Sequence, residues 1–146
     1  MTKDPREIAV RACVEEWTAA VRTLDVERAM ALYANDIVAF DAVNRLCCRG
    51  VTEYQAHWVE CMASCPFPAP IIIDTQQLEV QIENDLAVCW FLQRCGGITP
   101  DGEEQSSWMR GTQIYRQQGD VWRIIHEHFS APFDAVSGAP LFDAKP

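Results

Sequence analysis

The segment VWRIIHEHFSA, residues 121–131, brings two histidines and a glutamate together in a run with the composition of a β-strand. Side chains of a strand alternate between two faces. One face of this run would carry Trp122, Ile124, His126, His128 and Ser130, and the other would carry Arg123, Ile125, Glu127 and Phe129. Both faces mix large apolar groups with ionisable ones. We therefore expect one face to close a pocket and the other to meet a helix or a second subunit.

The spacing His126-x-His128 is one that a metal ion can use, because both imidazoles lie on one strand face. The only other histidine is His57, and no third ligand is evident. Cys61 and Cys65 lie one helical turn apart, without a second Cys/His pair at zinc-finger spacing. We therefore predict no metal site, and we interpret these residues as packed or interface histidines and as core or half-buried thiols.

Asp41 ends a short β-type run at residues 37–41 and is the first candidate for acid/base chemistry. A carboxylate at this position can act as a base if an apolar wall raises its pKa; the alternative is a turn or capping aspartate. Glu127 is either a second carboxylate of the site or the partner of Arg110 or Arg123 in an ion pair across the sheet. Arg110 in turn either holds an acidic substrate or lies exposed at a rim.

Composition limits the partners. The chain has 146 residues, of which 49% are hydrophobic, and a formal net charge of −9. This length suits one domain, and the acidity argues against nucleic acid and membrane surfaces as partners. No apolar run approaches the length of a membrane span, and the N-terminal residues lack the apolar region of a secretory signal. The seven cysteines are an odd number, so we expect reduced thiols in a cytoplasmic protein.

Hydrophobic periodicity and turn signals predict helices in the first half of the chain and a sheet in the second. The predicted elements are helices at 5–24, 26–35 and 53–65, a short strand at 37–41, and long strands at 71–82, 86–95, 105–116 and 121–131. The second helix would carry Tyr33 on its apolar face. This order predicts an α+β cone, in which three N-terminal helices pack on the concave face of a curled antiparallel or mixed sheet. Residues 1–133 would form a single domain, and residues 134–146 an exposed C-terminal tail.

This order, with IVAFDAVNRLCCRG after the second helix and WRIIHEHFSAPF near the end, resembles the SnoaL-like branch of the nuclear transport factor 2-like superfamily. That superfamily includes ketosteroid isomerases, polyketide cyclases and the association domain of calcium/calmodulin-dependent kinase. The resemblance covers residues 5–133 and depends on the pattern G-x-W-x-x-x-H-x-H-x-S-x-P, with Gly119 offset by one residue. It implies the cone-shaped fold, but the fold alone does not specify a reaction.

The resemblance implies roles for individual residues. Asp41 stands where ketosteroid isomerases carry their general base, and Trp17 stands where they carry the tyrosine that donates to the developing oxyanion. Their protonated aspartic acid would fall near Gly111 or Thr112, where this chain has no carboxylate. The resemblance therefore implies proton abstraction by Asp41 rather than ketosteroid isomerisation itself.

The resemblance also implies which face of the last strand lines the pocket. Phe129 stands where relatives place a pocket-lining aromatic residue or arginine. By alternation Glu127 and Ile125 would then face the pocket too. His126 and His128 would face the convex side, where relatives often form dimers. A β-bulge would reverse this assignment.

We therefore predict a small-molecule-binding protein of the SnoaL-like type, acting on an apolar carbonyl-bearing or cyclic substrate. As an enzyme it would be an isomerase, cyclase, dehydratase or hydrolase that works by acid/base chemistry without a cofactor. Asp41 would be the general base, and Trp17 and Arg110 would donate to the substrate oxygen. The predicted pocket residues are Tyr54, Trp58, Trp90, Glu127 and Phe129. The alternative is a non-catalytic ligand-binding or association module, and in either case we expect a homodimer.

Overall fold

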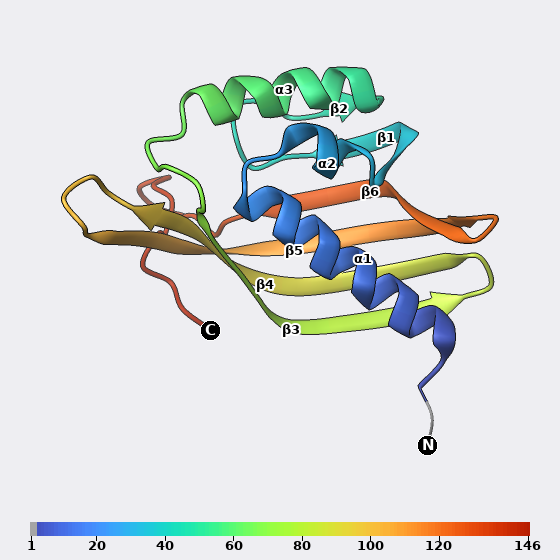
Figure 1. The fold of residues 1–146 in the computed structure, drawn as a ribbon. Coiled ribbons are helices and arrows are strands. Elements are labelled where there is room, and N and C mark those ends of the chain that lie inside the picture. The colour runs from blue at the N-terminus through green and yellow to red at the C-terminus, as the bar shows by residue number, and fades with distance from the viewer. Residues whose placement is uncertain (1–2) are drawn as a thin grey trace.

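The computed structural model describes residues 3–146; Met1 and Thr2, the first residues of the expected domain, lie outside the described part. Helices and strands alternate early in the chain and give way to a meander of long strands (Figure 1). Their bounds are α1 Pro5–Arg22, α2 Val26–Met30, β1 Tyr33–Phe40, β2 Cys48–Arg49, α3 Val51–Ala63, β3 Ile72–Glu83, β4 Leu86–Ile98, β5 Glu104–Gln118 and β6 Val121–Ser130. No helix within residues 3–146 is long and apolar enough to cross a membrane.

The strands form one curled sheet in the order β2-β1-β6-β5-β4-β3, and the helices lie on one of its faces (Figure 1). Strands β3 to β6 pair antiparallel, whereas β1 runs parallel to β6, so the sheet is mixed. The hydrophobic core fills the space between the helices and the concave face, with Val10 and Val14 of α1 above Cys89 and Tyr115 of the sheet. The predicted α+β cone is confirmed.

The second helix is shorter than predicted. It ends at Met30, and Tyr33 begins strand β1 instead of lying on a helical face. Tyr33 pairs with Ile124 of β6, and the N–H of Ile124 donates to the carbonyl of Leu32 at 2.9 Å. Pairing with a strand that is distant in the sequence thus overrides the local helical pattern. As a result Tyr33 faces the interior of the cone and is 3% exposed.

Strand β6 contains a β-bulge, whereas the predicted faces of this strand assumed an uninterrupted alternation of side chains. Tyr115 of β5 pairs with Ile124, while its neighbour Ile114 pairs with His126, so Ile125 is one residue in excess. Ile124 before the bulge and Glu127 after it are therefore both buried on the concave face. The prediction that Ile124 and Trp122 share a face with the two histidines is wrong, because the bulge shifts the alternation by one residue.

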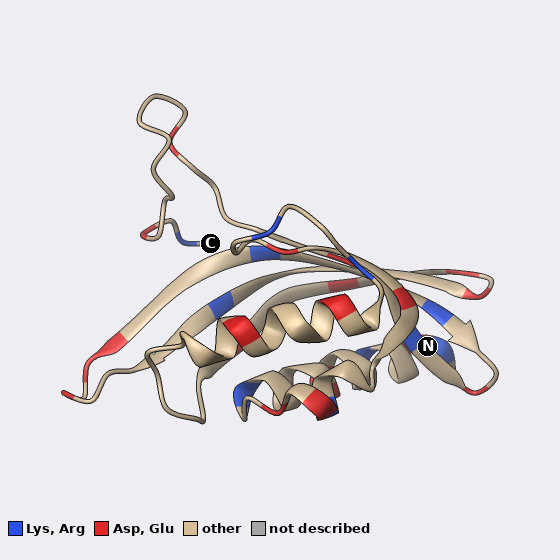
Figure 2. Ribbon diagram, turned by 90° about the horizontal axis from the view of Figure 1, so that it is seen from above, with Lys and Arg blue, Asp and Glu red and all other residues tan. Residues whose placement is uncertain are grey.

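The residues after β6 have local structure of their own. Phe133 and Pro140 form an isolated antiparallel bridge, and the carboxylate of Asp134 accepts from the N–H groups of Val136 and Ser137 at 2.9 and 2.8 Å. Figure 2 shows this segment extending away from the sheet as a loop. Most of the segment is exposed, but Phe142 borders the pocket described below.

Gly111 on β5 lies where the sheet packs closely against two aromatic rings of the interior. A Cβ atom at this position would lie 2.5 Å from Cε2 of Phe91 and 2.8 Å from Cε1 of Phe129. The two rings contact each other edge to face with centroids 6.0 Å apart, so neither can move aside freely.

We predict that Gly111→Ala lowers the free energy of unfolding by about 1–3 kcal/mol, measured by urea denaturation. Thr112→Ala, on the opposite face, is the control and should cost less; equal stability of Gly111→Ala and wild type would contradict this packing.

Candidate active site

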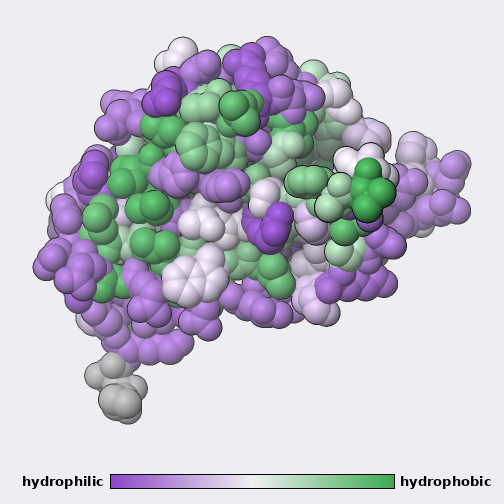
Figure 3. All heavy atoms as spheres, turned by 180° about the vertical axis from the view of Figure 1, so that it is seen from behind, coloured by the Kyte–Doolittle hydropathy of each residue, from purple (hydrophilic) through white to green (hydrophobic). Residues whose placement is uncertain are grey.

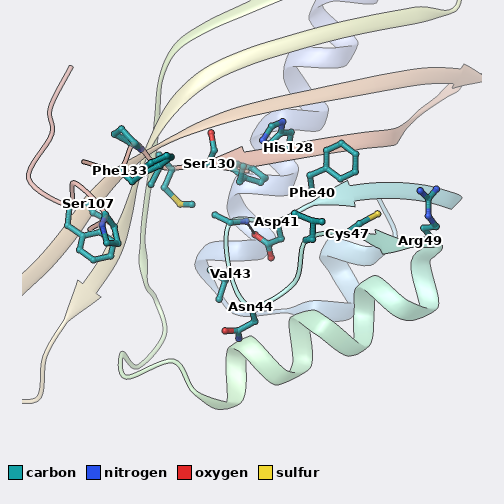
Figure 4. A pocket seen from close by; sticks show the side chains of 18 residues that line it. Phe40, Asp41, Val43, Asn44, Cys47, Arg49, Ser107, His128, Ser130 and Phe133 are labelled. Atoms are coloured by element: carbon teal, nitrogen blue, oxygen red, sulfur yellow. Dashed lines mark hydrogen bonds between the residues drawn. The ribbon is translucent and has the colours of Figure 1, made fainter. Parts of the chain in front are cut away.

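A pocket of about 1030 Å³ lies where β1 and β6 end. The loop after β1, the first half of β5 and the C-terminal segment supply its other walls (Figure 4). The lining is mainly apolar and includes Phe40, Met109, Phe129, Phe133 and Phe142. The polar part of the lining consists of Asp41, Asn44, Arg49, Ser107, His128 and Ser130. Such a combination suits a small apolar molecule that is oriented by a few polar contacts.

Asp41 lies on the wall of this pocket, directly after β1 (Figure 4). Its Oδ2 atom is 2.6 Å from Nε2 of His57, and its Oδ1 atom accepts from the N–H of Ala42 at 2.7 Å. An ionised carboxylate can only accept, so the hydrogen in the contact with His57 belongs to Nε2. The His57 side chain is fully buried, whereas the Asp41 side chain is 19% exposed. The pair therefore presents a fixed carboxylate to the pocket, with the imidazole behind it.

His57 lies on α3 between Tyr54 and Cys61, which share its helical face. Tyr54, one turn earlier, stacks on the imidazole with ring centroids 6.1 Å apart. Cys61, one turn later, places its Sγ atom 3.6 Å from Nε2 of His57. Burial, together with the negative charge of Asp41, raises the pKa of the Cys61 thiol. The spacing i, i+3 and i, i+4 on a helix brings these groups into contact.

Glu127 occupies the centre of a second polar cluster, deeper in the cone. Its carboxylate accepts from the hydroxyl of Tyr54 at 2.5 Å, from Nε2 of Gln113 at 2.7 Å and from the hydroxyl of Tyr33 at 2.8 Å. The Glu127 side chain is fully buried. Burial raises its pKa from 4.5 to about 7, and the hydrogen bonds from these three partners oppose that rise.

The cluster continues outward through its partners. The indole Nε1–H of Trp17 donates to the hydroxyl of Tyr33 at 2.7 Å, and the hydroxyl of Tyr115 donates to Oε1 of Gln113 at 2.9 Å. Within residues 3–146, every buried side-chain nitrogen and oxygen has a hydrogen-bond partner. The cluster is therefore a satisfied internal network, in which each group is held by its neighbours.

A family model of the SnoaL-like domain matches residues 10–134. The chain belongs to the SnoaL-like family. No curated protein matches it. A crystal structure of an NTF2-like protein of unknown function from Pseudomonas putida KT2440 is 43% identical, with a TM-score of 0.90 and full coverage of both chains.

Two more distant structures share the fold of this SnoaL-like protein. A ketosteroid isomerase-like protein from Erwinia carotovora atroseptica is 14% identical with a TM-score of 0.72, covering 88% of this chain and 97% of its own. A candidate calcium/calmodulin-dependent protein kinase II association domain from Xanthomonas campestris is 21% identical with a TM-score of 0.74, covering 90% and 89%. Proteins with this fold are therefore named both after an enzyme and after an association domain.

Of the predicted site residues, the structure of this SnoaL-like protein brings Asp41 and Phe129 together at the pocket. Trp17 stacks on Phe129 with centroids 5.6 Å apart and meets Trp58 edge to face, so these rings fill the cone between α1, α3 and the sheet. The indole N–H of Trp17 is already bonded to Tyr33. Tyr54 and Glu127 lie in the buried network behind the pocket rather than on its wall.

Arg110 and Trp90 lie apart from Asp41, on the outer face of the sheet. Both border a separate recess of about 320 Å³, and Trp90 is 44% exposed. His126 and His128 also lie on this face, where the ring of Phe40 packs edge to face against both imidazoles. Glu127 and Phe129 thus face the interior and the histidines face outward, but His128 and Phe40 also line the pocket beside Asp41 at the end of the sheet.

The sequence did not identify His57 or Tyr33 as functional residues. His57 lies 16 positions from Asp41 and in no motif, so the one signal that could have found it is its helical spacing from Tyr54 and Cys61. Tyr33 was assigned to a helix. Its role depends on the parallel pairing of β1 with β6, which has no local sequence signal.

The raised pKa of Glu127 predicts that stability depends on pH. The unfolded glutamate titrates near 4.5 and the folded one near 7, so between these values only the folded state holds the proton. The free energy of unfolding should therefore be largest below the unfolded value and fall as pH rises through this window. With about 1.4 kcal/mol per pH unit, the expected loss is about 3 kcal/mol, followed by a plateau.

Chemical denaturation at several pH values measures this effect. Glu127→Gln cannot ionise and should lose this component of the pH dependence. Glu79→Gln, at an exposed glutamate, is the matched control and should keep it. If the curves of Glu127→Gln and wild type run parallel between pH 4.5 and 7, the carboxyl group of Glu127 does not titrate as described.

Proposed function

We propose that this SnoaL-like protein is an acid/base enzyme that acts on a small apolar substrate bearing a carbonyl group or a ring. Asp41 is the general base. The observation that supports this role is a carboxylate held by a buried imidazole at 2.6 Å on the wall of an apolar pocket of about 1030 Å³. A base must reach its proton from a fixed position, and the geometry meets this requirement.

In the proposed reaction, Asp41 takes a proton from the carbon beside the substrate carbonyl. The electron pair of the broken C–H bond moves to the carbonyl oxygen and gives an enolate, and the proton is later returned to another carbon or lost with a leaving group. His57 keeps the carboxylate oriented through its bond to Oδ2. Ser130 and Asn44, which also line the pocket, are donors that can meet the substrate oxygen (Figure 4), and Arg49, Ser107 and His128 are further donors on its wall.

These donors replace Trp17 and Arg110 in the proposal, because the Trp17 indole N–H is engaged and Arg110 lies on the outer face. The interior space at Gly111 is occupied by the rings of Phe91 and Phe129, so it holds no acid of the ketosteroid isomerase type. We therefore propose chemistry of the same class on a different substrate. All seven cysteines are free thiols, which agrees with the proposed cytoplasmic location.

The proposal predicts that Asp41→Asn lowers kcat/KM by about 10²–10⁴-fold, because the amide has no carboxylate to accept a proton. The measurement is steady-state turnover on a panel of cyclic ketones and other carbonyl compounds. Asp36→Asn, at an exposed aspartate of the same strand β1, is the matched control and should retain wild-type rates. Equal rates for wild type and Asp41→Asn would remove the assigned base.

A second candidate function is association with another copy of the chain, and the exposed aromatic side chains on the outer face of the sheet support it. A cross-strand row on this face consists of Trp90, Thr112, His128 and Phe40, in which Trp90 is 44% and Phe40 39% exposed. Figure 3 shows this side of the molecule, with hydrophobic residues lying between hydrophilic ones. Aromatic side chains on an uncovered sheet suit an interface with a second copy, and the similar association domain adds to this case.

We predict a homodimer through this face. Trp90→Asp places a charge in the row and should shift the sedimentation coefficient from that of a dimer to that of a monomer. Val136→Asp, at a 98% exposed apolar residue of the C-terminal loop, is the control and should leave the dimer intact. A wild-type protein that sediments as a monomer, or an undisturbed Trp90→Asp dimer, would contradict this interface.

A further inference from the structure

Asp41, His57 and Cys61 bring three different metal-binding atoms to one point. Oδ2 of Asp41 and Sγ of Cys61 lie 2.6 and 3.6 Å from the same nitrogen, Nε2 of His57. All three atoms lie within 4.8 Å of one another. His57 and Cys61 are four residues apart on α3, so the helix fixes their relative position, and Asp41 approaches from the end of β1.

The donor set and spacing fit zinc. Carboxylate oxygen, imidazole nitrogen and thiolate sulfur are the atoms that Zn²⁺ binds, with bonds of about 2.0–2.2 Å to O and N and about 2.3 Å to S. Zinc binding therefore displaces the hydrogen from Nε2 of His57, which leaves the neutral imidazole protonated at Nδ1, and releases the thiol proton of Cys61. In a tetrahedron with these bonds, N and S are separated by about 3.6 Å and N and O by about 3.3 Å. The observed N–S distance of 3.6 Å already matches, and the N–O distance of 2.6 Å requires a modest outward movement of Asp41.

The thiol distinguishes this cluster from a site for hard cations. Ca²⁺ and Mg²⁺ bind mainly through oxygen atoms, whereas a thiolate beside an imidazole selects zinc and similar ions. The site is reachable, because Cys61 is half-buried and Asp41 is partly exposed at the pocket. Three protein ligands leave one tetrahedral position for water, as in zinc sites with exchangeable ligands.

We propose that Asp41, His57 and Cys61 form a binding site for Zn²⁺, and that occupation of this site switches off the acid/base reaction. The ion binds the carboxylate that would accept the substrate proton, so metal binding and proton abstraction exclude each other. The inhibitory part of this proposal rests on the proposed role of Asp41 as a base. The binding part rests on the geometry of the three side chains alone.

Metal titration of the full-length protein tests the site. By calorimetry, wild type should bind one Zn²⁺ per chain at this site. Cys61→Ala should bind it at least tenfold more weakly, because loss of even an outer-shell partner of a ligand costs about 10–100-fold in metal affinity. Cys65→Ala, four residues further along the chain, after the end of α3 and outside the cluster, should bind like wild type. With Co²⁺ as the probe, a thiolate-to-metal absorption band should appear in wild type and be absent in Cys61→Ala. Equal affinities for wild type and Cys61→Ala, or the absence of this band in wild type, would overturn the site.

The inhibition is tested by measuring the acid/base turnover of each variant with and without Zn²⁺. The result for each variant is the ratio of these two rates. Wild type and Cys65→Ala should lose turnover when loaded and recover it with a chelator, whereas Cys61→Ala should resist the ion. Undiminished turnover of zinc-loaded wild type would overturn the switch. If the metal-free protein lacks acid/base activity altogether, the proposed function and the switch fail together, while the titration still decides the metal site.

Discussion

The burial of the Glu127 carboxylate is the constraint on which the arrangement of this protein depends. An ionisable group that is removed from water costs several kcal/mol unless hydrogen bonds replace its hydration. The replacing groups come from three elements: Tyr33 from β1, Tyr54 from α3 and Gln113 from β5. The network therefore fixes the positions of a short strand, a helix and the central sheet relative to β6, and a displacement of any of them leaves a buried polar group without a partner.

This network also positions the candidate active site. Tyr54 anchors α3 to the sheet, and His57 follows one turn later on the same helical face, where it reaches Asp41 at 2.6 Å. The pairing of Ala39 with Glu127 sets the end of β1 beside the network, so Asp41 emerges at the edge of the packed interior. This geometry holds the Asp41 carboxylate on the side of His57 and leaves it open toward the pocket, as both the proposed proton transfer and the proposed metal binding require.

Aromatic packing determines where the cavity lies. Trp17, Trp58 and Phe129 occupy the interior of the cone, and Gly111 leaves the space that the rings of Phe91 and Phe129 fill. The space for a ligand consequently lies at the end of the sheet, between the loop after β1 and the C-terminal segment. Two proteins with this fold can thus place their cavities differently, because ring size and position in the core set the free volume rather than the order of the elements.

The α+β class and the long antiparallel strands could be predicted from the sequence, because composition, periodicity and turn residues are local properties, and the resemblance to the SnoaL-like branch made Asp41 a candidate base. The length of α2, the bulge at Ile125 and the partners of Asp41 and Glu127 depend instead on tertiary contacts. The parallel pairing of β1 with β6 places Tyr33, which the sequence pattern assigned to a helix, in a strand, where its hydroxyl donates to the Glu127 carboxylate. The bulge placed Ile124 and Glu127 on one face, and helix docking brought His57 to Asp41. Each of these contacts joins residues far apart in the chain, and their energies arise only when the elements pack together.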